Sequence, residues 1–141
     1  MAVKTEIEVE RDFYSFIKNG SLGSAIKGDV YRPDMRPADA KTEDLVVKFL
    51  AGLDEQIQTG VVILNLYIPD TKNKDGRLVR DAARIGELQS AIRAFIEGND
   101  ESEYWMETDG TPTSMKNEEI GQWCITARIH LSESVIKNKK V

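Results

Sequence analysis

The chain has 141 residues, a formal net charge of −5, 40% hydrophobic residues and 30% charged residues. This length predicts a single domain with its own core, and the acidic balance argues against a general nucleic-acid-binding protein, which usually carries a basic excess. No apolar run reaches the roughly 20 residues that span a membrane, no secretory leader is expected, and Cys124 is the only cysteine, so we expect a cytoplasmic protein.

The first predicted helix spans Glu6–Lys18, because its apolar residues recur at spacings of three and four and therefore share one face. Acidic residues near its start and Lys18 near its end suit the helix dipole. We expect Asn19-Gly20 to end this helix in the left-handed conformation and Ser21 to be the N-cap of a short helical turn. A short strand is then predicted at Gly28–Arg32.

The segment Pro33–Lys41 holds two of the four prolines and shows no periodicity. Proline cannot donate a hydrogen bond to a sheet ladder, so the segment is expected at a sheet edge or in a loop. Two interpretations remain open: a mobile arm, or a plain surface connection that leads into the next strand.

Two apolar strands are predicted at Asp44–Ala51 and Val61–Ile68. The first alternates between two faces, whereas the second is apolar on both faces except at Asn65. A strand of the second kind is usually central in its sheet and covered on both sides, and we expect the same here. The amphipathic segment Leu78–Glu97, ended by Gly98, is predicted to form a long helix across these strands.

Two features of this long helix allow alternative interpretations. Gly86 destabilises a helix by up to roughly 1 kcal/mol relative to alanine, and it indicates either a close approach of the helix to the sheet or a tolerated defect. The arginines in and before the helix would be able to hold a phosphate, but a surface of salt bridges is the favoured interpretation. These arginines are Arg77, Arg80, Arg84 and Arg93.

The connection Pro69–Gly76 is a loop by composition, with proline, glycine and alternating charges. Beyond the helix, strands are predicted at Glu103–Thr108 and Gln122–Leu131, with turn residues at Asp109–Pro112 between them. The last strand alternates strictly, so one side is expected to be buried and the other to face water or a partner. Ser132–Val141 is predicted to be a flexible tail.

Together these elements predict a single α+β domain at residues 1–131, followed by the tail at residues 132–141. The domain is expected to contain a mostly antiparallel sheet of about four to five strands. One long helix would pack across this sheet, beside a shorter N-terminal helix.

The sequence offers little catalytic chemistry. His130 is the only histidine, and it follows Cys124 by six residues on the same strand face, which places the two about 20 Å apart. A Cys–His nucleophile pair is therefore excluded, and one histidine with one cysteine cannot form a zinc site. Phosphate-binding glycine loops and the G-x-S-x-G and H-E-x-x-H motifs are absent. We predict no catalytic, cofactor-binding or metal-binding residue.

The segment Ser21–Tyr31 resembles the opening of bacteriophage tail proteins, with small residues, an apolar turn, a glycine, a strand and a tyrosine. Glu43–Val47 followed by Gln58–Asp70 resembles their paired central strands, and the long helix follows in the same place. The family indicated is that of phage tail terminator and tail-completion proteins, small α+β proteins that assemble as rings on the end of the tail tube. The likeness covers Asp12–Leu131 and consists of a pattern of elements without an invariant motif.

The resemblance implies a non-enzymatic structural subunit of a phage or prophage without a cofactor. Such a subunit would self-associate into a ring, with a hexamer as one possibility, and would contact tail-tube and head-completion proteins. It would bind neither nucleic acid nor a membrane, and it would reside in the host cytoplasm during assembly and in the virion of a functional phage. The candidate interface residues lie in three segments expected to be loops: Tyr31, Arg32, Asp34, Met35, Arg36, Lys72, Lys74, Thr113 and Met115.

Two other classes of function stay open. One is a small-ligand binding module or an enzyme, with a pocket between sheet and helix near Asn65, Tyr67 and Arg84. The other is a cytoplasmic interaction protein with no role in a virion. A mass measurement in solution separates these classes, because a ring has the mass of several subunits.

Overall fold

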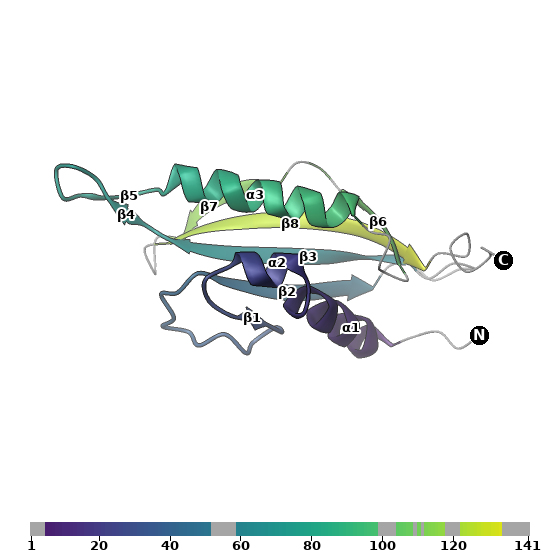
Figure 1. Ribbon diagram of the computed structural model, residues 1–141. Helices are drawn as coiled ribbons and strands as arrows, with labels where there is room; N and C mark the ends of the chain where they lie inside the picture. The colour runs from purple at the N-terminus through teal and green to yellow at the C-terminus, as the bar shows by residue number, and fades with distance from the viewer. Residues whose placement is uncertain are drawn as a thin grey trace.

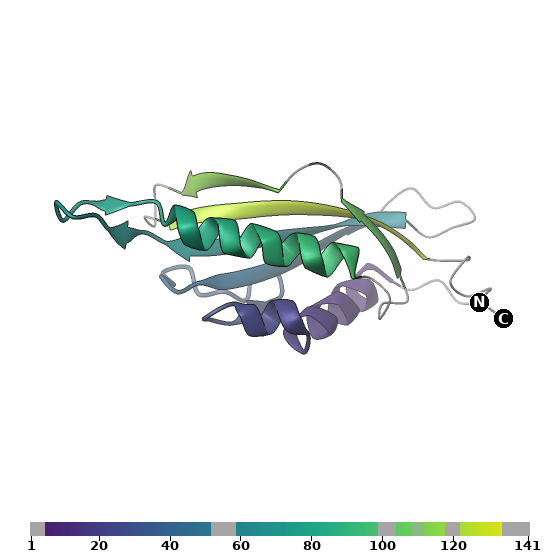
Figure 2. The same cartoon turned by 45° about the horizontal axis from the view of Figure 1, so that its top comes forward.

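The computed structural model describes residues 5–51, 59–98, 104–108, 110, 112–117 and 122–133. Its helices are α1 (Glu6–Lys18), α2 (Ser21–Ala25) and α3 (Ala82–Glu97). Its strands are β1 (Val30–Tyr31), β2 (Asp44–Ala51), β3 (Thr59–Pro69), β4 (Thr71–Lys72), β5 (Leu78–Val79), β6 (Tyr104–Thr108), β7 (Thr113–Asn117) and β8 (Gln122–Glu133). Figures 1 and 2 show the helices on one side of a long sheet.

The main sheet has the strand order β1-β2-β3-β8-β6, and β7 also pairs with β8. β1 runs parallel to β2, and the other pairs in this sheet are antiparallel. β6 and β7 pair with successive halves of β8 and form the edge opposite β1. The α+β class is therefore confirmed. The main sheet has six strands, one more than expected, because β7 was not predicted.

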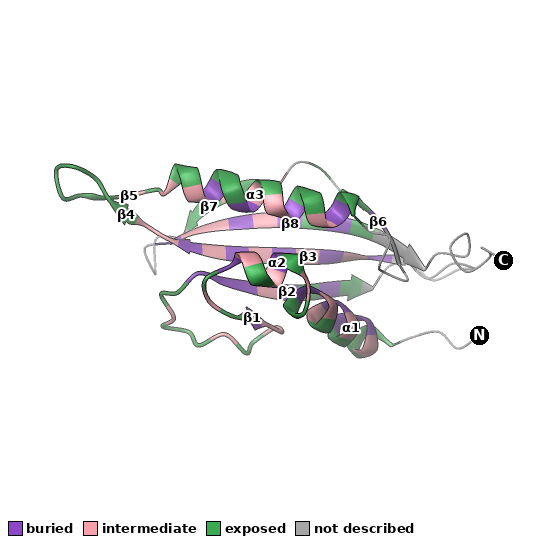
Figure 3. Cartoon of the chain, in the orientation of Figure 1, coloured by how far each residue is buried: buried purple, intermediate pink, exposed green. Residues whose placement is uncertain are grey.

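The core lies between the helices and one face of the sheet, here called the helix face (Figure 3). Residues at every second strand position and on the inner stripes of the helices form one buried cluster, as the two periodicities require. Full burial of one such aliphatic side chain stabilises the fold by about 1.5–3 kcal/mol. The largest completely buried side chains are Phe13, Ile17, Leu22, Leu45, Leu64, Leu66, Ile68, Leu88, Ile92, Ile125 and Ile129.

β3 is central, as predicted, because it lies between β2 and β8. The expectation that it is covered on both sides is wrong. Leu64 and Leu66 are fully buried on the helix face, whereas Val61, Ile63 and Tyr67 on the other face are only half-buried. Among the described residues no helix lies over that second face, which we call the open face.

The long helix begins four residues later than predicted. Asp81 is its N-cap, and the Asp81 side chain accepts a hydrogen bond from the Arg84 N–H at 3.2 Å. Leu78 does not join the apolar stripe of the helix; it is 62% exposed. Leu78–Val79 pairs instead with Thr71–Lys72, so part of the predicted loop is a two-stranded ribbon. We call residues 70–80 the arm, which extends beyond the sheet at the left of Figure 1.

The bounds of α1 are those predicted, but its ends differ from expectation. Thr5 and Glu8 form a reciprocal capping box at the start. Asn19, at the end, has φ −93° and is therefore not left-handed. The N-cap of α2 is Gly20, without a side-chain hydrogen bond, and Ser21 is the first helical residue.

Three further boundaries change. Residues 113–117 were expected in a loop and form β7 beside β8. The predicted strand at Gly28–Arg32 is shorter, since only Val30–Tyr31 pairs with β2. β8 continues to Glu133, two residues into the predicted tail, and residues 134–141 lie outside the described part of the chain.

Candidate interaction surface

Two consecutive carboxylates, Glu43 and Asp44, stand at the start of β2, and both are buried. Successive strand residues point to opposite faces of a sheet, so Glu43 points to the helix face and Asp44 to the open face. Gly28 lies against both residues, and a Cβ at this position would collide with Asp44 Oδ1 and the Glu43 carbonyl oxygen. A glycine is required where the chain passes between α2 and β1.

Glu43 connects the helix layer to the sheet. Arg84 of α3 donates from Nη2 to Glu43 Oε1 at 2.6 Å and from Nε to Oε2 at 2.9 Å, and Nη2 also donates to the Ala25 carbonyl at 2.7 Å. The Lys27 N–H donates to Glu43 Oε1 at 2.9 Å. Burial by itself would raise the pKa of Glu43, but the hydrogen bonds from Arg84 and Lys27 outweigh it, so the pKa lies below its usual value.

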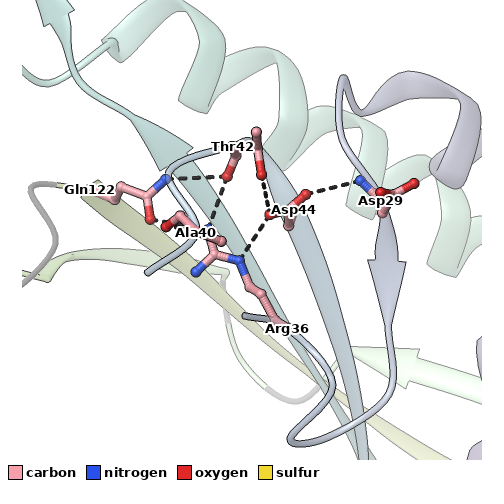
Figure 4. A network of polar contacts seen from close by, with 6 residues as sticks. All are labelled: Asp29, Arg36, Ala40, Thr42, Asp44 and Gln122. Carbon is pink, nitrogen blue, oxygen red and sulfur yellow. Dashed lines mark hydrogen bonds and ion pairs between the residues drawn. The ribbon is translucent and has the colours of Figure 1, made fainter. Parts of the chain in front are cut away.

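Asp44 is the centre of a second hydrogen-bond network, on the side of the open face (Figure 4). It accepts hydrogen bonds from Arg36 Nε at 3.0 Å, Thr42 Oγ1 at 2.5 Å and the Asp29 N–H at 2.9 Å. Burial opposes the charge of Asp44, but these donors and the Arg36 charge lower its pKa below the usual value. Arg36 Nη2 also reaches the Oε1 atom of Gln122 on β8 at 3.1 Å.

The Arg36 guanidinium also lies 4.1 Å from the ring centroid of Tyr67 on β3, a cation–π contact. The segment 32–41, here called the proline loop, therefore contacts β2, β3 and β8 through one side chain. Burial raises the pKa of the Tyr67 hydroxyl, and the Arg36 charge opposes that shift only in part. Of the two interpretations for this segment, the structure shows a surface connection fixed at Arg36.

The strand register arranges the open face into rows of side chains. The two rows nearest Arg36 are mostly polar, and the two rows farther from it combine aliphatic with basic or imidazole side chains. Leu50 is 39% exposed and Met115 is 74% exposed. The rows, taken across β2, β3, β8 and the edge strands, are Asp44–Tyr67–Cys124–Met115, Val46–Asn65–Thr126–Thr113, Lys48–Ile63–Arg128 and Leu50–Val61–His130–Glu107.

Cys124 and His130 lie on this face, in different rows of β8. Burial raises the pKa of the Cys124 thiol, so it is not an activated nucleophile. Thr126 Oγ1 donates to Asn65 Oδ1 at 3.0 Å. No group of three or more metal-binding side chains occurs in the described ranges.

The candidate interface residues before β2 have different environments. Tyr31 is in β1, and Arg32 donates from Nε to Glu10 Oε1 of α1 at 3.0 Å. Asp34 has a left-handed φ of 67° at the tip of the proline loop, and Met35 beside it is 66% exposed. The Arg36 side chain is only 9% exposed, so it holds the loop in place and is not accessible to a partner.

The other candidates occupy two further regions. Thr113 and Met115 lie on the open face of β7, next to the row under Arg36. Lys72 and Lys74 are exposed on the arm and do not share a face with them. The structure thus brings Arg36, Thr113 and Met115 together and leaves the two lysines on a separate projection.

The structure does not form the ligand pocket that was considered between sheet and helix. Arg84 is bound to Glu43 on the helix face, whereas Asn65 and Tyr67 are on the open face. A groove of about 540 Å³ lies elsewhere, beside α3, and Gly86 lines it. A Cβ at Gly86 would meet open space, so a close approach to the sheet does not explain this glycine. The groove is lined by Gly86, Gln89, Ser90, Arg93, Thr108, Gly110 and Pro112.

Sequence reasoning missed the two buried carboxylates and Gln122, which accepts a hydrogen bond from Arg36. The available signal was a pair of acidic residues directly before an apolar strand, where a charge is expected to be buried only with a partner.

No described helix is long and apolar enough to cross a membrane. Neither a protein-family model nor a curated protein matches the sequence.

Proposed function

We propose that this protein is a non-enzymatic structural subunit of a phage or prophage tail. It assembles with copies of itself into a ring on the end of the tail tube and contacts head-completion proteins there. The observation that carries the proposal is the open face. In an antiparallel sheet a solvated face is normally polar, yet here Val46, Val61 and Ile63 are half-buried and Leu50 is exposed.

Contiguous apolar side chains on a surface mark a contact with another molecule. Ile63 lies between Lys48 and Arg128 in one row, and the next row adds Leu50 and Val61, which suits an interface that combines apolar and charged side chains. The proline loop is fixed beside these rows by the Arg36–Asp44 pair, so the surface is formed before a partner binds. A preformed surface loses little conformational entropy on association.

The buried ionisable groups have structural partners. Glu43 is paired with Arg84, 41 positions away on α3, and Asp44 is paired with Arg36, eight positions away in the proline loop. Their hydrogen bonds hold an element against the sheet. This use of the charged groups supports a structural subunit over an enzyme.

The experiment is a tube-capping assay. Tail tubes from the phage or prophage that encodes the protein are mixed with the full chain and viewed by negative-stain electron microscopy. We expect rings on one end of the tubes, and we expect Ile63→Glu to abolish them. The new carboxylate would lie between Lys48 and Arg128 in its row, so the folded subunit tolerates it.

Ala83→Glu is the matched control, because it adds the same charge at an exposed position of α3. We expect this variant to cap tubes like the unaltered chain. Bare tube ends with the unaltered chain at saturating concentration would contradict the proposal.

A further inference from the structure

The arm has a charge opposite to that of the rest of the molecule. Residues 70–80 hold four basic and two acidic side chains, on a chain whose net charge is −5. Lys72 and Lys74 are exposed. Leu78, which pairs with Lys72 across the ribbon, is 62% exposed. An exposed apolar side chain with cations beside it is suited to an acidic surface that also carries an apolar residue.

The arm has a defined structure of its own. The Asn73 N–H donates to the Arg77 carbonyl at 2.8 Å, and the turn closes at Gly76, whose φ of 85° favours glycine. Arg77 Nε donates to Asp75 Oδ2 at 2.7 Å, whereas neither Lys72 nor Lys74 forms an ion pair with another described residue. At the base, the Arg80 guanidinium lies 5.1 Å from the Trp123 ring centroid and joins the arm to β8.

A complementary surface lies at the opposite end of the molecule. Figures 1 and 2 show the arm at one end and the start of α1 at the other. There Ile7 is 58% exposed and points away from the core stripe of Val9 and Phe13. Glu6 and Glu8 stand on either side of Ile7 in the first turn.

Arg11, one turn farther along α1, contacts Asp12 at 3.5 Å. The first turn of α1 therefore presents an apolar side chain between two carboxylates. The arm presents an apolar side chain beside cations, because Leu78 pairs with Lys72 across the ribbon and follows Arg77 in the chain.

We propose that the arm of one copy docks on the first turn of α1 of the next copy, with Leu78 against Ile7 and the arm lysines beside Glu6 and Glu8. This inference rests on the proposed ring assembly and assigns one of its contacts. Because the two halves lie at opposite ends of each subunit, the contact is heterologous: it links copies head to tail and closes into a ring when the rotation permits. Exposed charge pairs are individually weak and are screened by salt, so this contact is expected to weaken as salt rises.

The test is a charge-reversal series followed by sedimentation velocity of the full chain. Lys72→Glu with Lys74→Glu is expected to weaken self-association about tenfold or more at low salt. Arg93→Glu with Lys116→Glu reverses two exposed cations outside the arm and off the open face and is the matched control. We expect the control pair to associate like the unaltered chain.

Rescue makes the test specific. Adding Glu6→Lys to the arm-reversed chain restores an opposite charge at the contact and leaves both Ile7 and the capping-box residue Glu8 unchanged. We expect association to recover, with circular dichroism showing the same helix content in all variants. If the arm-reversed chain associates normally, or the rescue has no effect, the arm inference is overturned while the ring proposal stands. Absence of both self-association and tube capping in the unaltered chain overturns the two together.

Discussion

The two faces of the sheet have similar aliphatic residues and different neighbours. On β3, Leu64 and Leu66 are fully buried under the helices, while Val61 and Ile63 on the open face are half-buried. Both sets satisfy the same pattern in the sequence. An apolar strand face therefore predicts a covering layer. The pattern does not indicate whether that layer belongs to the same chain.

The same comparison holds for the charged groups. Glu43 and Asp44 are adjacent in sequence and bind one arginine each, from α3 on the helix face and from the proline loop toward the open face. On one face the ion pair fixes a helix that completes the core. On the other it fixes a loop that borders the open face.

The largest effect is expected from removing one arginine. Arg36→Ala leaves the Asp44 carboxylate buried without its cation, and Arg84→Ala does the same to Glu43. Breaking a buried pair in this way destabilises a protein by about 3–5 kcal/mol. Urea unfolding of each variant measures the free energy of unfolding that is lost when the ion pair on that face is broken. A loss below about 1 kcal/mol for Arg36→Ala would show that the loop is not fixed by this pair.

Truncation of aliphatic residues on β3 compares the faces directly. Leu64→Ala creates a cavity under the helices and is expected to cost about 2–5 kcal/mol. Ile63→Ala removes a side chain that is half-buried in the single subunit, so about 1 kcal/mol is expected. Both are measured by urea unfolding at a protein concentration low enough to keep the chain dissociated. Equal losses would contradict the assignment of an open face.

Acid should weaken both ion pairs. The pKa values of Glu43 and Asp44 lie below their usual values, because hydrogen bonds and arginine charges outweigh the effect of burial. A carboxyl group of this kind stabilises the fold above its unfolded pKa, and the contribution is lost as pH falls through the folded pKa. We expect the free energy of unfolding to fall below about pH 4. In Asp44→Asn the fall should be shallower, by up to about 1.4 kcal/mol per pH unit for one proton.

The smallest effect is expected at Gly86, on the solvent side of α3. Its position is exposed, and a Cβ there meets open space. Gly86→Ala should therefore stabilise the subunit by about 1 kcal/mol, the difference in helix propensity. Thermal unfolding measures this gain. A loss of stability would mean that the groove beside α3 is occupied by another part of the chain.

Local patterns predicted the elements with strong periodicity. The bounds of α1 and β2 and the alternation of β8 follow from residues close in sequence. The start of α3 was misplaced because the cap at Asp81 is a single polar residue within an apolar stripe. The two strands of the arm are too short for a periodic signal and exist because they pair with each other.

The surface itself was less predictable. Arg36 contacts Gln122 across 86 positions, so no local pattern reveals that the proline loop is fixed. Met115 was predicted to be an interface residue in a loop. It lies on the open face, in β7. The family resemblance pointed to segments and contained no information on which face of the sheet is uncovered.

Native mass spectrometry of the full chain tests the central claim most directly, because one subunit has a mass of 15.9 kDa. We predict a discrete species at an integer multiple of that mass, replaced by the single subunit in Ile63→Glu and retained in Ala83→Glu. A species of 15.9 kDa alone at every protein concentration, with the unaltered chain correctly folded, would contradict assembly through the open face.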